Sequence, residues 1–336
     1  MSDDGLNTDR DRKAMLATHR FLTIALCVIA TSAVSTTAVA QERSNRRTLD
    51  GHSFLTTSTV GDPFVGTYVA TLTAAGRALD MQVPVYDLDG NQIAILDGNI
   101  AFLQLGFTYQ QQLAKWLALR LNVTGAARMG TNHVSLLAEG ATAVYGGSFG
   151  AVFRLVESRK VFLSLLADVR GNSLYAISPL SFAEAVIESG GIDSTTQLLG
   201  KGNNGRFVGG VRAAYAFAPW FGITGLVEFG PAQRFFEDET GDRDGTTFEA
   251  GGTASFDLRP GTSVPIGFVG SFLYQSENER GDDLVGKQTV FGLGVFYNGR
   301  QDFQIGVEAN FQRLDQRGLD NKINATQIKL LLRYDF

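Results

Sequence analysis

The 336-residue chain has little cysteine, proline or histidine and no excess of positive charge. Its single cysteine, Cys27, excludes a disulfide within one chain. The three histidines and one cysteine form no cluster with the spacing of a zinc site, so we expect neither a metal nor a cofactor. The net charge of −5 argues against nucleic acid as a partner.

Long hydrophobic runs are absent after residue 40, so the sequence predicts no spanning helix there. Before that point, the apolar stretch Phe21–Val34 precedes a small-x-small cleavage site that ends at Ala40. This pattern predicts a signal peptide over residues 1–40, cleaved near Ala40, and hence an exported protein. The chain offers two possible starts, Met1 and Met15, and only the second leaves an n-region without acidic residues.

Alternation of apolar and polar residues recurs through the rest of the chain. In "DFQIGVEANFQ", Phe303, Ile305 and Val307 share one face, while Gln304 and Glu308 share the other. A period of two indicates β-strands. We count eleven such stretches between residues 99 and 336 and expect a twelfth within residues 63–86, where the pattern also fits a helix.

The connections between these stretches alternate between short and long. Short ones such as "ESRK" and "APW" alternate with long polar ones such as residues 128–143 and 171–204. This alternation is typical of a transmembrane barrel, with short periplasmic turns and long extracellular loops. We therefore predict an all-β fold, an antiparallel up-and-down barrel of about twelve strands, with 10 to 14 possible.

The predicted organisation has three parts. Residues 1–40 are the signal peptide, residues 41–61 a periplasmic leader, and residues 62–336 the barrel. Within the barrel, residues 62–98 stay open between a first strand, a plug and a helix. Both tryptophans, Trp116 and Trp220, fall in short turns, which predicts that they lie in the aromatic girdle at the periplasmic interface.

The chain ends on the strand-like run "IKLLLRYDF". One of its faces holds Ile328, Leu330, Leu332, Tyr334 and Phe336. This run resembles the C-terminal assembly signal of bacterial outer-membrane barrels, which has a terminal Phe, an aromatic residue two positions earlier and apolar residues at alternate positions before it. The resemblance implies that the barrel-assembly machinery is a partner of the last strand.

More broadly, residues 62–336 resemble a family of outer-membrane β-barrel proteins of Gram-negative bacteria. The resemblance rests on "LGFTYQQQLAKWLA" (Leu105–Ala118), "ARMGTNHVSLLAEG" (Ala127–Gly140), "VPIGF" (Val264–Phe268) and the last nine residues. It implies the fold and the bacterial outer membrane as the location, with membrane lipid and lipopolysaccharide as surroundings. It implies no particular activity.

Charged residues in the strands predict what lines the lumen, because a lipid-facing Arg or Lys at mid-bilayer costs about 2–4 kcal/mol. We expect these side chains to point inward: Arg120, Arg154, Asp168, Arg212, Glu228, Glu249, Asp257, Glu308, Lys329 and Arg333. Two interpretations stay open. The charges form a salt-bridged network that fills a narrow barrel, or they line a polar pore that selects a small solute.

An enzymatic site is the least favoured reading. His133 and Ser135 have the H-x-S spacing of outer-membrane lipid hydrolases, and Glu139 is the nearest residue that could orient the histidine. The family pattern has Asn in that role or an acid on a later strand, so we expect no catalytic residues. We also expect no calcium loop at Asp87–Gly98, because Gly98 stands where the coordinating Glu is required.

The sequence therefore predicts a passive outer-membrane channel or transporter for small solutes. The first alternative is a structural or surface-interaction barrel with a filled lumen, and the second is a lipid-acting membrane enzyme.

Overall fold

The computed structural model describes residues 47–86, 92–131, 141–177, 199–232, 245–279, 286–316 and 322–336. All of them belong to one compact unit, Asn45–Phe336. The predicted signal peptide lies outside the described residues, as do His133, Ser135 and Glu139.

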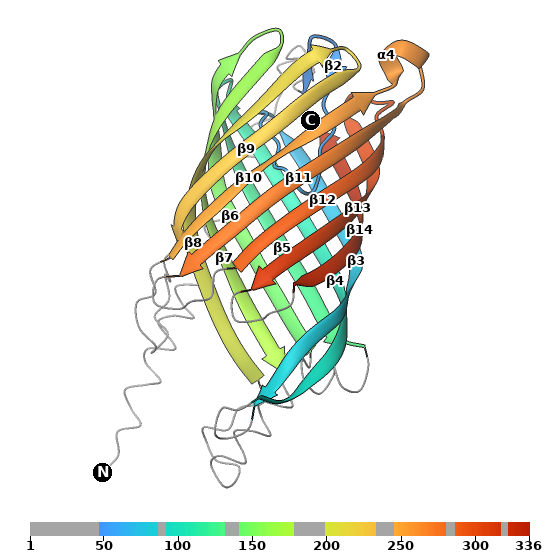
Figure 1. The fold of residues 1–336 in the computed structure, drawn as a ribbon. Helices are drawn as coiled ribbons and strands as arrows, with labels where there is room; N and C mark the ends of the chain where they lie inside the picture. The colour runs from blue at the N-terminus through green and yellow to red at the C-terminus, as the bar shows by residue number, and fades with distance from the viewer. Residues whose placement is uncertain are drawn as a thin grey trace, which may run out of the picture. The chain divides into compact units, whose positions relative to one another are not determined.

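Twelve strands close into a single antiparallel barrel (Figure 1). The barrel strands are β3 (Tyr68–Tyr86), β4 (Gln92–Ala114), β5 (Leu117–Gly130), β6 (Ala141–Glu157), β7 (Val161–Ile177), β8 (Leu199–Ala218), β9 (Phe221–Ala232), β10 (Gly245–Asp257), β11 (Ile266–Glu279), β12 (Gly286–Tyr297), β13 (Phe303–Gln316) and β14 (Ile323–Asp335). The last strand pairs with the first, from Asp335 opposite Tyr68 to Asn324 opposite Leu79. The predicted fold class is confirmed.

Short connections lie at one end of the barrel, at residues 115–116, 158–160, 219–220, 258–265 and 298–302. The fourth of these contains the only described helix, the single turn α4 (Arg259–Thr262). Strand β7 runs to Ile177 and β8 begins at Leu199, so the loop predicted at residues 171–204 is partly strand. Ile177 and Leu199 are ladder partners, and this pairing satisfies backbone groups that an extended loop would leave to water.

The predicted ambiguity at residues 62–98 is settled within the described residues. Tyr68–Tyr86 and Gln92–Ala114 are the first two barrel strands and not a helix. Residues 47–67, which include most of the segment predicted as a periplasmic leader, contact inward-facing residues of the barrel wall and the short turns beside them. This segment opens with a small hairpin, β1 (Thr48–Leu49) and β2 (His52–Ser53), and continues without regular structure to Thr67. We call residues 47–67 the plug.

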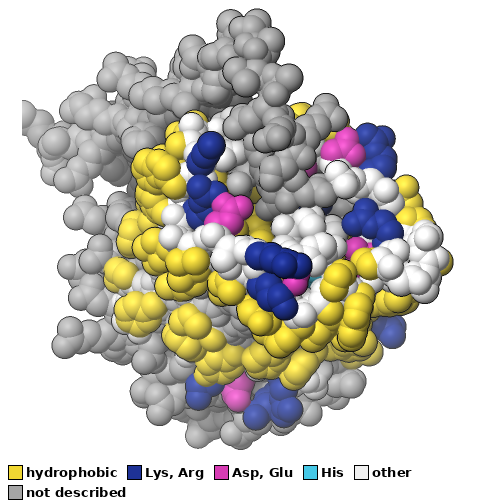
Figure 2. Space-filling model, turned by 90° about the horizontal axis from the view of Figure 1, so that it is seen from above, with side chains coloured by type: hydrophobic (Ala, Val, Ile, Leu, Met, Phe, Trp, Pro, Cys, Tyr) yellow, Lys and Arg dark blue, Asp and Glu magenta, His cyan; other side chains and the backbone are white. Residues whose placement is uncertain are grey.

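In Figure 1, β2 of the plug, α4 and the C-terminus lie at the same end of the barrel, the upper end in that view. Figure 2 looks onto this end: hydrophobic side chains form much of the outside, and several Lys, Arg, Asp and Glu side chains lie nearer the middle.

The outer surface of the barrel is an apolar belt. On β9, for example, Ile223, Val227 and Phe229 point outward and are exposed, while Leu226 and Glu228 between them are buried. Aromatic residues flank the belt on the short-turn side, where Trp220 stacks on Phe256 with ring centroids 6.3 Å apart. An apolar band with aromatic girdles is the outer surface of a barrel that crosses a bilayer. Among the described residues, no helix is long and apolar enough to cross a membrane.

The outward face of β9 provides a test of this placement. We expect Val227→Arg, at a position that is 53% exposed near the middle of the strand, to lower the free energy of unfolding in lipid vesicles by about 2–4 kcal/mol. Denaturant unfolding of the refolded barrel would measure the change. Gln301→Arg, in an exposed short turn, is the matched control and should change little. Equal effects of the two substitutions would contradict a lipid-facing β9.

Candidate functional site

The candidate site is the lumen. The structure places the predicted lumen residues on the inward faces of their strands, and most of them are buried: Arg120, Asp168, Arg212, Glu228, Asp257, Glu308, Lys329 and Arg333. Glu249 is partly buried there as well. Arg154 differs, because it lies beside the 158–160 turn and pairs with the partly exposed Glu157 instead of joining the interior.

A charged network crosses one side of the lumen from β5 to β10. Arg120 donates to Asp168 at 2.5 Å, and Arg212 donates to Glu228 at 2.5 Å. Arg170 links the two pairs, because it contacts Asp168 at 3.5 Å, bonds Glu228 and reaches Glu249 at 3.5 Å. Burying such charges is tolerable only when they are paired and hydrogen-bonded, as here.

The plug is held on the opposite side by residues of β13 and β14. Arg47 donates to Gln304 at 2.7 Å and forms an ion pair with Asp335 at 3.0 Å. Ser58 donates to Glu308 through its hydroxyl at 2.5 Å and through its backbone N–H at 3.1 Å.

Asp62 lies between the two sides of the lumen. Its carboxylate pairs with Arg333 of β14, and its backbone carbonyl accepts from Arg212 of β8 at 3.1 Å. Three of the predicted lumen charges therefore bind the plug: Arg212, Glu308 and Arg333. The lumen network and the plug form one polar structure.

Apolar contacts fill the spaces between these bonds. Phe64 of the plug packs on Phe162 of β7 with ring centroids 4.9 Å apart, in a cluster that also includes Leu49, Phe54 and Val65 of the plug. Val60 packs on inward-facing residues of β9, β11 and β12, and Leu55 packs on Val269 and Phe296. The plug thus touches the wall on several sides.

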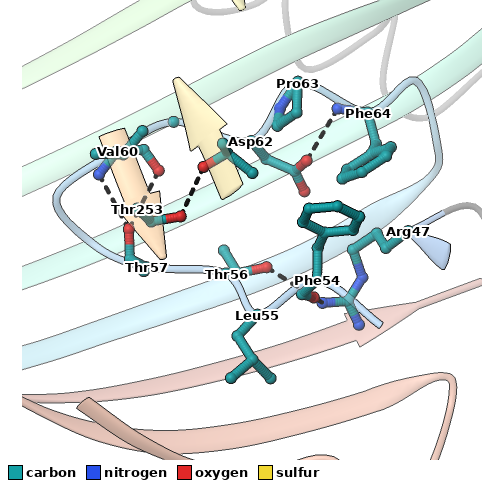
Figure 3. A pocket seen from close by; sticks show the side chains of 12 residues that line it. Arg47, Phe54, Leu55, Thr56, Thr57, Val60, Asp62, Pro63, Phe64 and Thr253 are labelled. Atoms are coloured by element: carbon teal, nitrogen blue, oxygen red, sulfur yellow. Dashed lines mark hydrogen bonds between the residues drawn. The ribbon is translucent and has the colours of Figure 1, made fainter. Parts of the chain in front are cut away.

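Figure 3 shows the small pocket that the plug encloses with β9 and β10. Thr57 and Val60 close a tight turn through two hydrogen bonds, and Asp62 accepts from the backbone N–H of Phe64 at 2.9 Å. Most of the pocket wall belongs to the plug itself, with Thr224 and Thr253 from the barrel. The plug therefore has an internal structure of its own.

His52 fastens the start of the plug to the barrel wall. Its Nε2 shares a 2.7 Å hydrogen bond with the Ser255 hydroxyl of β10, and its Nδ1 lies 3.3 Å from the Pro219 carbonyl. A serine bonded to a histidine resembles a nucleophile with its base. Here His52 is 0% and Ser255 1% exposed, so no substrate reaches either side chain. The hydrogen bond between His52 and Ser255 therefore holds the plug to the barrel wall, and we call these two residues the latch.

The lumen changes character along its length. On β5, Ala118 and Arg120 near the short turns are buried, whereas Thr124 and Arg128 on the same inward face are exposed. On β7, Ser164 and Asp168 are buried, and Asn172 on the same face is exposed. The plug fills the short-turn half of the lumen, and the half toward the long loops is open to solvent on these strands.

The other predicted positions are placed as follows. Trp116 and Trp220 lie exposed in two short turns at the same end of the barrel. Ile328, Leu330, Tyr334 and Phe336 point outward and are exposed, and Leu332 on the same face is half-buried. The calcium-like positions Asp87, Asp89 and Asn91 lie outside the described residues. Within the described part of the chain, no group of three His, Cys, Asp or Glu residues could hold a metal ion.

The sequence contained a signal for the plug that the alternation pattern hid. Near the short turns, inward positions are apolar as well as outward ones: Phe162 and Leu166 on β7, and Ala214 and Ala216 on β8. Apolar residues on both faces of a barrel strand require something apolar inside the barrel. The apolar residues of the plug, Leu49, Phe54, Leu55, Val60 and Phe64, match that requirement.

No family model matches the chain, and no curated protein matches its sequence. Several solved structures share part of the fold. They include the β domain of the Bordetella autotransporter BrkA (12% identity, 81% of this chain and 100% of that one, TM-score 0.47). A second is the translocator domain of the autotransporter NalP from Neisseria meningitidis (9% identity, 96% and 98% covered, TM-score 0.45). A third is the COG4313 outer membrane channel from Pseudomonas putida F1 (14% identity, 81% and 96% covered, TM-score 0.44).

The latch makes docking of the plug depend on pH. Burial lowers the pKa of His52, against the opposing influence of the Pro219 carbonyl and the nearby Asp257. With the plug released, His52 regains its ordinary pKa of about 6.5. The released state then binds more protons, so docking is fully stable above that value and weakens as the pH falls below it. Asp50 of the plug stays ionised in this range, because a hydrogen bond from Arg159 lowers its pKa.

We therefore expect protease cleavage within residues 47–67 of the folded barrel to rise between pH 7 and pH 5. His52→Gln, which keeps a hydrogen-bonding side chain but does not titrate, should remove most of this dependence. The same pH dependence in His52→Gln would show that another group is responsible.

Proposed function

We propose that this chain is an outer-membrane channel for small polar solutes, closed at its short-turn end by its own N-terminal segment. In this proposal the short turns face the periplasm and the long connections face the outside. Membrane lipid and lipopolysaccharide surround the barrel, and the barrel-assembly machinery inserts it.

The observation that carries the proposal is the change from buried to exposed residues along the inward face of β5 and β7. A barrel that is only a structural support gains nothing from a polar, solvent-exposed half-lumen. A channel needs a polar, solvent-exposed lumen, together with a barrier that can move. The plug supplies that barrier as a continuous segment attached to the wall mainly through side chains, not as part of the strand ladder.

A second candidate is a structural or surface-interaction barrel with a permanently filled lumen. The apolar contacts of Phe64 with Phe162 and of Leu55 with Phe296 favour it, because they bury hydrophobic surface that release of the plug would expose to water. The two candidates differ in one measurable property, which is whether displacing the plug opens a path for ions.

Gly222 of β9 allows the plug to be displaced by a single methyl group. A Cβ at this position would lie 2.5 Å from Cδ2 of His52 and 2.8 Å from Cε1 of Phe54, and both of these are plug side chains. We expect the wild-type barrel to be nearly silent in planar bilayers, and Gly222→Ala to show discrete conductance steps.

The matched control is Gly225→Ala on the same strand, where a Cβ would have no neighbour closer than the Gly251 carbonyl at 3.6 Å. It should remain as silent as wild type. A variant without residues 45–61 provides an independent opening. If that variant folds, as shown by circular dichroism and resistance to cold SDS, and still conducts no current, the filled barrel is the correct reading. Full conductance of the wild type would show that the plug is no barrier.

A further inference from the structure

The open half of the lumen is chemically divided. From β11 round to β4, its wall carries five glutamines: Gln275, Gln288, Gln312, Gln327 and Gln104. We call these residues the amide band. Four of them are joined head to tail: Gln288 donates to Gln312 at 3.5 Å, Gln312 to Gln327 at 3.3 Å, and Gln327 to Gln104 at 3.0 Å.

Strand β3 lies between β14 and β4 but does not interrupt the amide band. Its inward residues opposite Gln327 and Gln104 are Gly76 and Ala74, which are too small to separate the two amides. At the other end, Gln275 pairs with Gln288 across β11 and β12 and donates to Glu249 at 3.3 Å. The band therefore continues into the charged side of the lumen.

Most of the described charges on the other side of the lumen are paired with each other. The guanidinium groups in these pairs belong to Arg120, Arg170, Arg206 and Arg212, and the carboxylates to Asp168, Glu228, Glu249 and Glu277. Beyond these pairs, Arg128 of β5 lies exposed on the same inward face. An ion that binds at the paired side chains would have to displace a partner from a pair that is already formed, which is costly in a partly desolvated lumen.

The amide band offers the opposite chemistry. A glutamine amide has two donor hydrogens and two acceptor lone pairs. The head-to-tail chain uses one donor and one acceptor of each inner member, so further donors and acceptors remain. Gln104, Gln288 and Gln312 are only partly buried. A hydroxyl group both donates and accepts hydrogen bonds, so it can bind both kinds of group on this surface. An ion can bind only the donors or only the acceptors.

From this arrangement we infer that the open half-lumen binds neutral, hydroxyl-rich solutes, of which small carbohydrates are the main class. The inference rests on the proposed channel function for its biological meaning. It differs from the interpretation in which charged residues of the lumen select the solute, because in this proposal the amide band selects it.

Binding to the full mature chain in detergent micelles tests the inference without requiring passage. Three probes of similar size are compared by equilibrium dialysis: raffinose, which is neutral, a trimer of galacturonic acid, which is anionic, and a trimer of glucosamine, which is cationic. We expect raffinose to bind best. Removing one amide should weaken it about five- to tenfold, so Gln104→Ala and Gln312→Ala should each raise the dissociation constant by that factor.

Gln301→Ala is the matched control, since Gln301 is exposed in the short turn at 298–302 and should leave binding unchanged. Tighter binding of either charged trimer would overturn the inference. So would raffinose binding that both lumen variants retain in full, or its absence in a folded wild type. The binding test and the conductance test can fail separately. A barrel that conducts but does not bind raffinose contradicts only the inferred solute class. A barrel that binds raffinose but never conducts contradicts only the proposed channel function.

Discussion

The structure depends on one constraint, which is that a strand crossing a bilayer finds no water for its backbone N–H and C=O groups. Closing twelve strands into a ring pairs all of these groups, and β14 joined to β3 is the contact that completes the ring. The alternation of side chains with a period of two then determines which residues face lipid and which face the lumen. Every residue that cannot face lipid must face the interior, so the lumen receives charges in numbers that the barrel has to neutralise within a narrow space.

The lumen meets this demand in two ways along its length. In the short-turn half, the chain supplies its own filling. The plug provides Asp62 for Arg333, Ser58 for Glu308 and the Asp62 carbonyl for Arg212, so it adds hydrogen-bond partners to charges of the wall. Next to the plug, Arg120, Arg170 and Arg212 pair with Asp168, Glu228 and Glu249 on the wall itself. On the wall from β11 round to β4, glutamines form the amide band.

This division separates two kinds of contact along one lumen. The filled half carries the apolar contacts, such as Phe64 on Phe162, and contains the only described histidine that fastens plug to wall. The open half carries uncharged hydrogen-bonding groups, the glutamine amides of β12, β13, β14 and β4. Apolar packing and uncharged polar groups thus occupy different levels of one lumen.

Local sequence patterns predict the barrel, the strand number within two, the inward position of charges such as Asp168 and Glu228, and the outward position of Ile328 and Phe336. These follow from local alternation and from the high energy of a charge in lipid, which act on each strand separately. Only the tertiary structure decided where the plug lies, that His52 meets Ser255, and that five glutamines from β11 to β4 form one band. Those contacts join residues far apart in the sequence, 257 positions in the case of Arg47 and Gln304, and no local pattern records which inward faces meet across a closed barrel.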